Sequence, residues 1–301
     1  MAKTPTAPEA QLIDPEVVAK LARLEVRARG VVEGSYSGMH KSPHRGSSVE
    51  FAEYRKYAPG DDIKHIDWKV YAKTDRFYIK EFEADTNLRC HLVVDASGSM
   101  GFGSKDITKF DYARKMAATL AHLVVHQGDA VGLQCFDEKL RQDLPAKASP
   151  KHFRSVLDTL AQAKPRGTTQ LTGVLHDLAE AIPRRALVIV FSDFFTDVPA
   201  LLDSFQHMRF RKHDLAVFHL IDPQETSFEF DRSIRFADLE SDNAVVAEPA
   251  AIRDAYLREI NAYLDDMRRG CLESHVDYQR VDTSLPYAAA LTEFLLKRQT
   301  K

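Results

Sequence analysis

The feature that most constrains the fold is an alternation of short apolar segments with longer amphipathic segments between residues 86 and 222. The apolar segments have the length of buried strands, and they are His91–Val94, Ala130–Phe136, Ala186–Phe191 and Leu215–Ile221. The segments 108–125, 150–163 and 171–182 repeat apolar residues every three or four positions, which is the spacing of an amphipathic helix. Strands that alternate with helices are typical of a mostly parallel sheet covered by helices on both faces. We therefore expect a doubly wound α/β domain over residues 86–222.

An N-terminal part, residues 1–85, precedes this domain. Its pattern predicts a helix over 15–29, followed by a loop rich in Gly, Ser and His over 30–48. The next segment, 49–85, is polar but contains eight aromatic residues. So short a segment does not form a core around that many aromatic side chains, so we expect it to pack on the larger domain.

A C-terminal part, residues 223–301, follows the domain. Its predicted elements, in order, are a hairpin near 228–246, a helix from Pro249 to about Arg268, a strand over 275–281 and a helix over 287–297. These elements either extend the sheet or cap its edge. The sequence thus predicts three parts, residues 1–85, 86–222 and 223–301.

The charge balance and the apolar runs exclude several classes of protein. The 301 residues include 41 Lys and Arg against 44 Asp and Glu, and this lack of a basic excess argues against a general nucleic-acid binder. No apolar run approaches the roughly 18 residues that a membrane-spanning helix needs, and the N-terminus lacks the apolar stretch of a signal peptide. The three cysteines, Cys90, Cys135 and Cys271, form no Cys-x-x-Cys pair, so we expect buried thiols in a cytoplasmic protein.

Oxygen-bearing side chains follow the predicted strands at three places. The first strand ends in Asp95-Ala-Ser97-Gly-Ser99, the loop before the helix at 171 contains Thr168 and Thr169, and the strand at 186–191 runs into Ser192-Asp193. Ligands of open α/β sheets bind outside the carboxyl ends of the strands. Carboxylates and hydroxyls that converge there favour Mg²⁺, Mn²⁺ or Ca²⁺ over softer metals. The alternative is structural, with the serines starting a turn and Asp193 capping a helix.

The order of these motifs resembles the von Willebrand factor A (VWA) domain, a Rossmann-type fold with a metal-ion-dependent adhesion site. The resemblance implies that the metal ligands are Asp95, Ser97, Ser99, Thr169 and Asp193, with Mg²⁺ as the first choice of metal. Thr169 matches the family pattern better than Thr168, because the apolar residues from Leu171 onward then align. In this family an acidic side chain of a partner protein completes the metal's coordination.

A longer segment is similar to a bacterial family named domain of unknown function 58. The similarity lies in the segment 48–83, which includes Pro59-Gly60-Asp61-Asp62 and Asp67-Trp68, and in Asp222-Pro223-Gln-Glu225 and Phe236-Ala-Asp238-Leu239-Glu240 further on. Many relatives begin with membrane-spanning helices, which this sequence lacks. The segment 48–83 has two readings that the sequence leaves open, a clasp that holds the N-terminal part in place or a partner-binding face.

The resemblance narrows the function to three hypotheses. Members of the family commonly occur beside MoxR-type AAA+ ATPases, which implies a non-enzymatic adaptor in protein maturation or remodelling. A Mg²⁺-dependent hydrolase, such as a phosphatase, is the first alternative. Against it, residue 97 is Ser, so the Asp-x-Asp pair of haloacid-dehalogenase-type phosphatases is missing, and the three loops contain no obvious His or Lys base. The second alternative is a structural subunit whose metal site is empty.

Overall fold

The computed structural model describes residues 12–28, 49–56, 68–84, 88–230, 234–237, 239–240 and 244–299. The chain forms two compact units, one made of residues 1–29 and 88–301 and the other of residues 30–87. Each unit is described separately. The three sequence segments remain a prediction about organisation along the chain.

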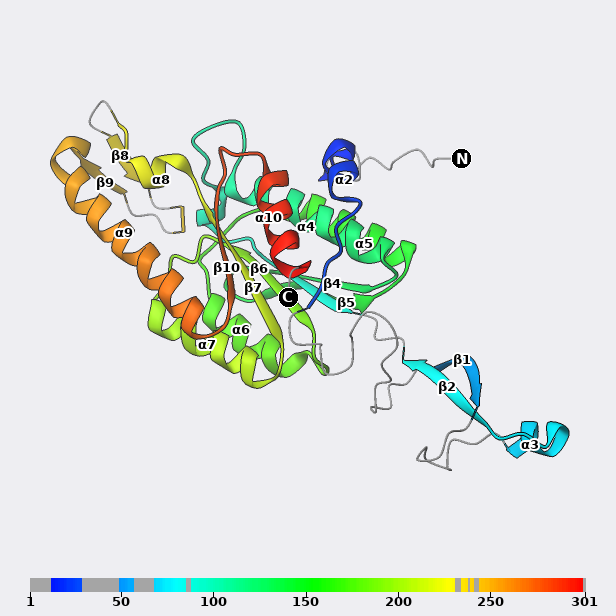
Figure 1. Cartoon of the computed structure of the whole chain (residues 1–301). Coiled ribbons are helices and arrows are strands. Elements are labelled where there is room, and N and C mark those ends of the chain that lie inside the picture. The colour runs from blue at the N-terminus through cyan, green and yellow to red at the C-terminus, as the bar shows by residue number, and fades with distance from the viewer. Residues whose placement is uncertain are drawn as a thin grey trace. The chain divides into compact units, whose positions relative to one another are not determined.

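The larger unit is built on a six-stranded sheet with the strand order β10-β7-β6-β3-β4-β5 (Figure 1). The strands are β3 (Arg89–Asp95), β4 (Ala130–Phe136), β5 (Leu140–Lys147), β6 (Leu187–Ser192), β7 (Asp214–Ile221) and β10 (Asp277–Asp282). All neighbouring pairs are parallel except β4 and β5. The strand β5 is antiparallel to β4, and β10 shows that the C-terminal part extends the sheet.

Helices cover both faces of the sheet, which confirms the predicted doubly wound α/β fold. One face and its apolar core involve α2 (Pro15–Leu21), α4 (Lys109–His126), α5 (Pro150–Gln162) and α10 (Tyr287–Gln299). The other face involves α6 (Leu171–Ala181), α7 (Val198–Phe210) and α9 (Pro249–Glu273). The central strands β3, β6 and β7 are buried almost throughout, because each is covered from both sides. Their near-continuous apolar sequences follow from that burial.

Two helices differ in length from the sequence prediction. The helix α2 ends at Leu21 instead of reaching residue 29. Beyond it, the backbone N–H of Val26 donates to Gln127 at the end of α4 (2.9 Å). A tertiary contact is therefore found where the sequence predicts the last helical turns of α2. The helix α9 continues to Glu273, five residues past the predicted end.

The smaller unit contains an antiparallel pair of strands and one short helix (Figure 1). The strands are β1 (Val49–Lys56) and β2 (Tyr78–Ala84), which pair from Val49 with Ala84 to Lys56 with Tyr78. The helix α3 (Trp68–Thr74) lies between them in the chain. Trp68 is 59% exposed and makes an edge-to-face contact with Tyr71. The predicted turn at Pro59-Gly60 lies outside the described residues.

The direction in which successive strands are added to the sheet reverses at β3. This reversal determines where the site lies. From β3 the chain moves outward to β4 and β5, and it then returns to the other side of β3 as β6 and β7. Such a reversal opens a crevice at the carboxyl ends of the two strands that flank it. Here those ends carry Asp95 and Ser192. Among the helices of the described chain, none is long and apolar enough to cross a membrane.

Candidate functional site at the carboxyl ends of β3 and β6

Three loops meet at the crevice between β3 and β6. The loop after β3 is joined to the loop before α6 by two backbone hydrogen bonds, from Gly98 N to Gly167 O (2.8 Å) and from Arg166 N to Ala96 O (2.9 Å). It is joined to the end of β6 by a bond from Ser192 Oγ to Asp95 Oδ2 (2.6 Å). The structure therefore brings together the loops that carry all five residues of the predicted metal site, although their role as ligands remains a prediction.

The oxygen atoms of these residues are buried and only partly paired. Asp95 is fully buried, and its Oδ1 accepts a bond from the backbone N–H of Ser97 (2.9 Å). The hydroxyls of Ser97 and Ser99 lie 3.1 Å apart. The hydroxyl oxygen of Thr169 is buried and has no hydrogen-bond partner among the described residues. A buried hydroxyl without a partner is costly in a folded protein, so its presence here needs a functional explanation.

The carboxyl of Asp95 is under electrostatic strain. Its pKa is raised to about 7, chiefly by burial and also by the nearby Asp193 carboxylate, against hydrogen bonds from Ser192 and Ser97 that lower it. Ionised Asp95 is thus costly at neutral pH unless a positive charge lies close by. A bound cation would remove that cost.

The loop after β6 is held rigidly. Phe194 follows Asp193 and has a left-handed backbone (φ 54°), which is unusual for a residue with a side chain. Its N–H donates to Ser192 Oγ (2.9 Å), the same hydroxyl that donates to Asp95, and its carbonyl accepts a bond from Tyr263 on α9. These contacts fix the position of Asp193 relative to Asp95.

Lys109 is a charged residue of the site that sequence reasoning missed. Its side chain is almost fully buried, and its Nζ donates to Asp193 Oδ2 (2.8 Å) and to Glu225 Oε1 (2.6 Å). Burial lowers the pKa of Lys109, but the two carboxylates more than offset that effect, so the net shift is upward. Lys109 is therefore a protonated cation that neutralises part of the negative charge at the site.

One signal in the sequence pointed to Lys109. It is the first residue of α4, directly after the N-cap Thr108. The positive end of the helix dipole disfavours a cation there, so a buried lysine at that position needs compensating carboxylates. Glu225 provides one from α8 (Pro223–Ser227), where its other oxygen closes a capping box with Asp222.

The residues fit one divalent cation of the hard, oxygen-preferring kind. Two carboxylates and three hydroxyls would form the donor set, and the unpaired Thr169 hydroxyl and the raised pKa of Asp95 both suit a positive ion at this position. No group of three or more His, Cys, Asp or Glu that could hold a metal occurs within the described ranges.

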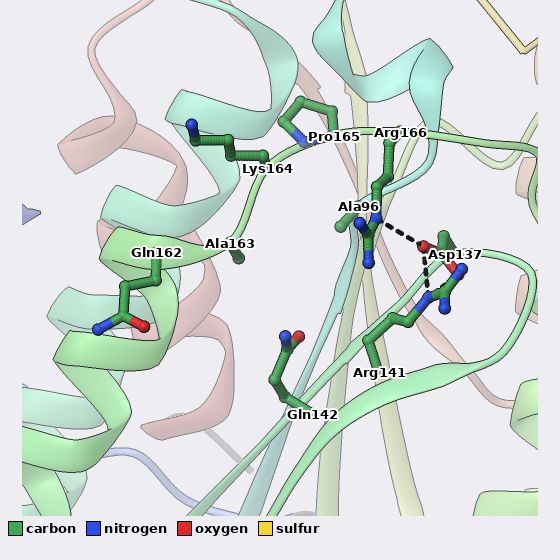
Figure 2. Close-up of a pocket in the computed structure, with 9 residues that line it drawn as sticks. All are labelled: Ala96, Asp137, Arg141, Gln142, Gln162, Ala163, Lys164, Pro165 and Arg166. Carbon is green, nitrogen blue, oxygen red and sulfur yellow. Dashed lines mark hydrogen bonds and ion pairs between the residues drawn. The ribbon is translucent and has the colours of Figure 1, made fainter.

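A polar pocket of about 360 Å³ lies beside the three loops (Figure 2). It begins at Ala96, next to Asp95, and includes Arg141 of β5 with Lys164 and Arg166 of the loop after α5. Figure 2 shows both arginines turned toward the buried Asp137, which lies 2.6 Å from Arg141 and 3.6 Å from Arg166. Three cationic side chains against one carboxylate give the pocket a net positive charge.

Comparisons with known proteins place the chain among uncharacterised relatives. The model of a family described as "Protein of unknown function DUF58" matches residues 53–263. An uncharacterized protein of Mycobacterium tuberculosis is 28% identical over 298 residues, which cover 95% of this chain and 91% of the relative.

Among the solved structures that align with this chain, two illustrate the low sequence identity. An aerotolerance-related membrane protein from Bacteroides fragilis aligns with a TM-score of 0.48 at 17% identity, over 70% of this chain and 100% of that one. The SpRpn10 VWA domain aligns with a TM-score of 0.39 at 13% identity, over 69% of this chain and 94% of that one.

Proposed function

This chain belongs to the family described as protein of unknown function DUF58, and we propose that it is a non-enzymatic, metal-dependent protein-interaction module. In this proposal a divalent cation, Mg²⁺ in the first instance, is held by Asp95, Ser97, Ser99, Thr169 and Asp193. When bound, the cation supplies an open coordination position for an acidic side chain of a partner protein.

The observation that carries the proposal is the buried, unpartnered hydroxyl of Thr169, in a loop that is hydrogen-bonded to the loop after the buried Asp95. A purely structural site would be expected to satisfy that hydroxyl and to keep the two aspartates apart, because each defect costs stability. Strain of this kind collects at functional sites. The strain at these residues supports a cation-binding site over a purely structural turn.

The charge around the site supports an acidic partner. Arg141, Lys164 and Arg166 line the adjacent pocket, and Arg166 is 67% exposed. A positive rim attracts a negatively charged surface and raises its association rate. The resemblance to the family implies a MoxR-type AAA+ ATPase as this partner, with the chain acting as an adaptor in protein maturation or remodelling.

The hydrolase alternative finds no general base in Lys109. Lys109 is the basic side chain nearest the aspartates in the described contacts, and it is held as a cation between Asp193 and Glu225. A base has to accept a proton in the reaction, and a lysine with a raised pKa is already protonated. The adaptor is therefore the better-supported function.

The metal site is tested by calorimetric titration of Mg²⁺ and Mn²⁺ into the metal-free chain and into Asp95→Asn. The wild-type chain should bind one ion, and the variant should bind none. Because a proton on Asp95 competes with the metal, the wild-type affinity should increase as the pH is raised through about 7. Equal binding by the wild type and the variant would place the ion elsewhere and overturn the assignment.

The partner is tested by a pull-down with a MoxR-type ATPase encoded in the same genome, with Mg²⁺ and with EDTA. Capture that needs both Mg²⁺ and Asp95 supports the adaptor. Hydrolysis of p-nitrophenyl phosphate that needs Asp95 would instead favour the phosphatase.

A further inference from the structure

Two described residues of the C-terminal part, Leu239 and Glu240, lie against the loops of the proposed metal site. The strands β8 (Ile234–Ala237) and β9 (Ala244–Ala247) form an antiparallel pair in which Ala237 opposes Ala244. The connection between them contains Leu239 and Glu240. Both residues belong to the same compact unit as the site, so their contacts with it are contacts within one body.

The backbone of Leu239 lies against Gly98, the residue between Ser97 and Ser99. A Cβ atom added to Gly98 would be 2.1 Å from the carbonyl oxygen of Leu239 and 2.8 Å from its carbonyl carbon. Only a residue without a side chain allows so close an approach. Gly98 therefore allows the backbone of Leu239 to pack directly against the Ser97-Gly98-Ser99 loop.

The side chain of Glu240 reaches the second loop of the site. Its Oε2 accepts a bond from the backbone N–H of Thr169 (3.4 Å), and the residue is half-buried. Thr169 is also the residue whose buried hydroxyl has no partner. Glu240 thus places a carboxylate at the site where the proposed function requires an acidic side chain.

We propose that Glu240 is an acidic ligand that the chain supplies to its own metal site, so that a partner has to displace the β8–β9 turn before it binds. This inference rests on the proposed function, because it assigns the open coordination position of that site. It is carried by two independent contacts, Leu239 with Gly98 and Glu240 with Thr169.

Glu138 provides a matched comparison. It is another glutamate at the same edge, and its Oε1 accepts a bond from the hydroxyl of Thr168, one residue before Thr169 (3.3 Å). It follows β4 and does not belong to the turn. A difference between Glu240→Gln and Glu138→Gln therefore separates a ligand from a general effect of negative charge near the site.

The experiment titrates Mn²⁺ into the full chain by calorimetry for the wild type, Glu240→Gln, Glu138→Gln and Asp95→Asn. Loss of a group that orients a metal ligand commonly weakens metal binding by about 10–100-fold. We expect a loss of that size for Glu240→Gln and a change below about threefold for Glu138→Gln. Hydrogen–deuterium exchange of β8 and β9 gives the second readout. Mn²⁺ should slow this exchange in the wild type but not in Glu240→Gln.

The outcomes distinguish this inference from the proposed function. If Glu240→Gln binds Mn²⁺ as the wild type does while Asp95→Asn does not, the metal site stands and the role of Glu240 is overturned. Equal weakening by both glutamine variants also overturns it, since charge alone would then account for the effect. If the wild type does not bind Mn²⁺, both proposals fail. Thermal unfolding of each variant in EDTA controls for loss of the fold.

Discussion

At the scale of single residues, Lys109 has the largest influence on the charge of the site. Its side chain is only 1% exposed, and its ammonium forms ion pairs with both Asp193 and Glu225. The Lys109 ammonium also lies 5.1 Å from the ring centre of Phe195 and 5.8 Å from that of Phe102. A buried ion pair contributes little net stability when intact, but the loss of one partner leaves an isolated charge. Lys109 therefore both holds Asp193 in place and competes with a cation for it.

We expect Lys109→Met to lower the free energy of unfolding in EDTA by about 3–5 kcal/mol, because Asp193 and Glu225 lose their counter-charge. Excess Mg²⁺ should restore more stability to this variant than it adds to the wild type, since the ion then meets an unneutralised carboxylate and binds more tightly. Urea unfolding with and without Mg²⁺ measures both effects.

The control for Lys109→Met is Arg114→Met on the same helix. Arg114 forms a partly exposed ion pair with Asp111, so its loss should cost less than about 1 kcal/mol and should show no Mg²⁺ dependence. Similar losses for the two variants would contradict the role given to Lys109.

The sequence pointed to the candidate site residues that are close to strand ends, whose role as ligands stays a prediction, and it did not point to those brought in from a distance. Asp95, Ser97 and Ser99 share one loop, and their spacing and position are visible in the sequence. Lys109 meets its carboxylates across 84 and 116 residues, and Glu240 meets Thr169 across 71. No local pattern encodes such pairs, because only the packing of the helices and the hairpin brings them together.

At the scale of elements, the start of α4 connects helix capping with the site. The hydroxyl of Thr108 accepts a bond from the backbone N–H of Asp111 (3.0 Å) and so fixes the first turn that carries Lys109. The helix α5 begins in the same way, with a bond from His152 N to Ser149 Oγ (3.2 Å). The two caps are chemically equivalent, but only that of α4 adjoins the aspartates.

Thr108→Ala and Ser149→Ala should each lower the free energy of unfolding by about 1 kcal/mol, the usual contribution of an N-cap. Only Thr108→Ala should also change the Mn²⁺ affinity, in the same direction as Lys109→Met, because it loosens the turn that holds the lysine. Chemical unfolding and calorimetry test the two parts separately. An equal effect of both variants on Mn²⁺ binding would contradict the link between the cap and the site.

Periodicity predicted the elements well because the core strands and helices are strongly patterned. It failed at the end of α2, where the apolar residues Leu24 and Val26 continue the helical spacing but the backbone turns to Gln127 instead. The apolar spacing at Leu24 and Val26 reflects burial of those two side chains. An extended segment can bury them as well as a helix can. Burial was predicted correctly, and the backbone conformation was wrong.

At the scale of the whole molecule, Arg298 joins parts of the larger unit that are far apart in sequence. It is fully buried on α10, and its guanidinium donates to Asp214 at the start of β7 (2.7 Å), to Asp277 at the start of β10 (3.0 Å) and to the carbonyl of Arg27 (2.8 Å). These contacts lie at the ends of the strands opposite the site. Arg298 therefore fixes both the N-terminal segment and the last helix to the sheet.

Arg298→Met should lower the free energy of unfolding by about 3–5 kcal/mol, because two buried carboxylates lose the cation that pairs with both of them. Its neighbour Lys297 forms an exposed ion pair with Glu293, so Lys297→Met should cost less than about 1 kcal/mol. Urea unfolding of the two variants provides the comparison. Because Arg298 lies at the other end of the strands, Mn²⁺ affinity should be unchanged in any Arg298→Met protein that remains folded.

The long separations within the site also set an order of events during synthesis. Asp95 and Lys109 leave the ribosome early, whereas Glu225 and Glu240 follow only after β6 and β7 have been made. At the usual translation rate of about 5–20 residues per second, the interval is of the order of ten seconds. In a nascent chain that stops before Glu225, Lys109 has one carboxylate partner in place of two. The first turn of α4 is then less stable. The contacts of the site are therefore complete only after Glu240 has been made.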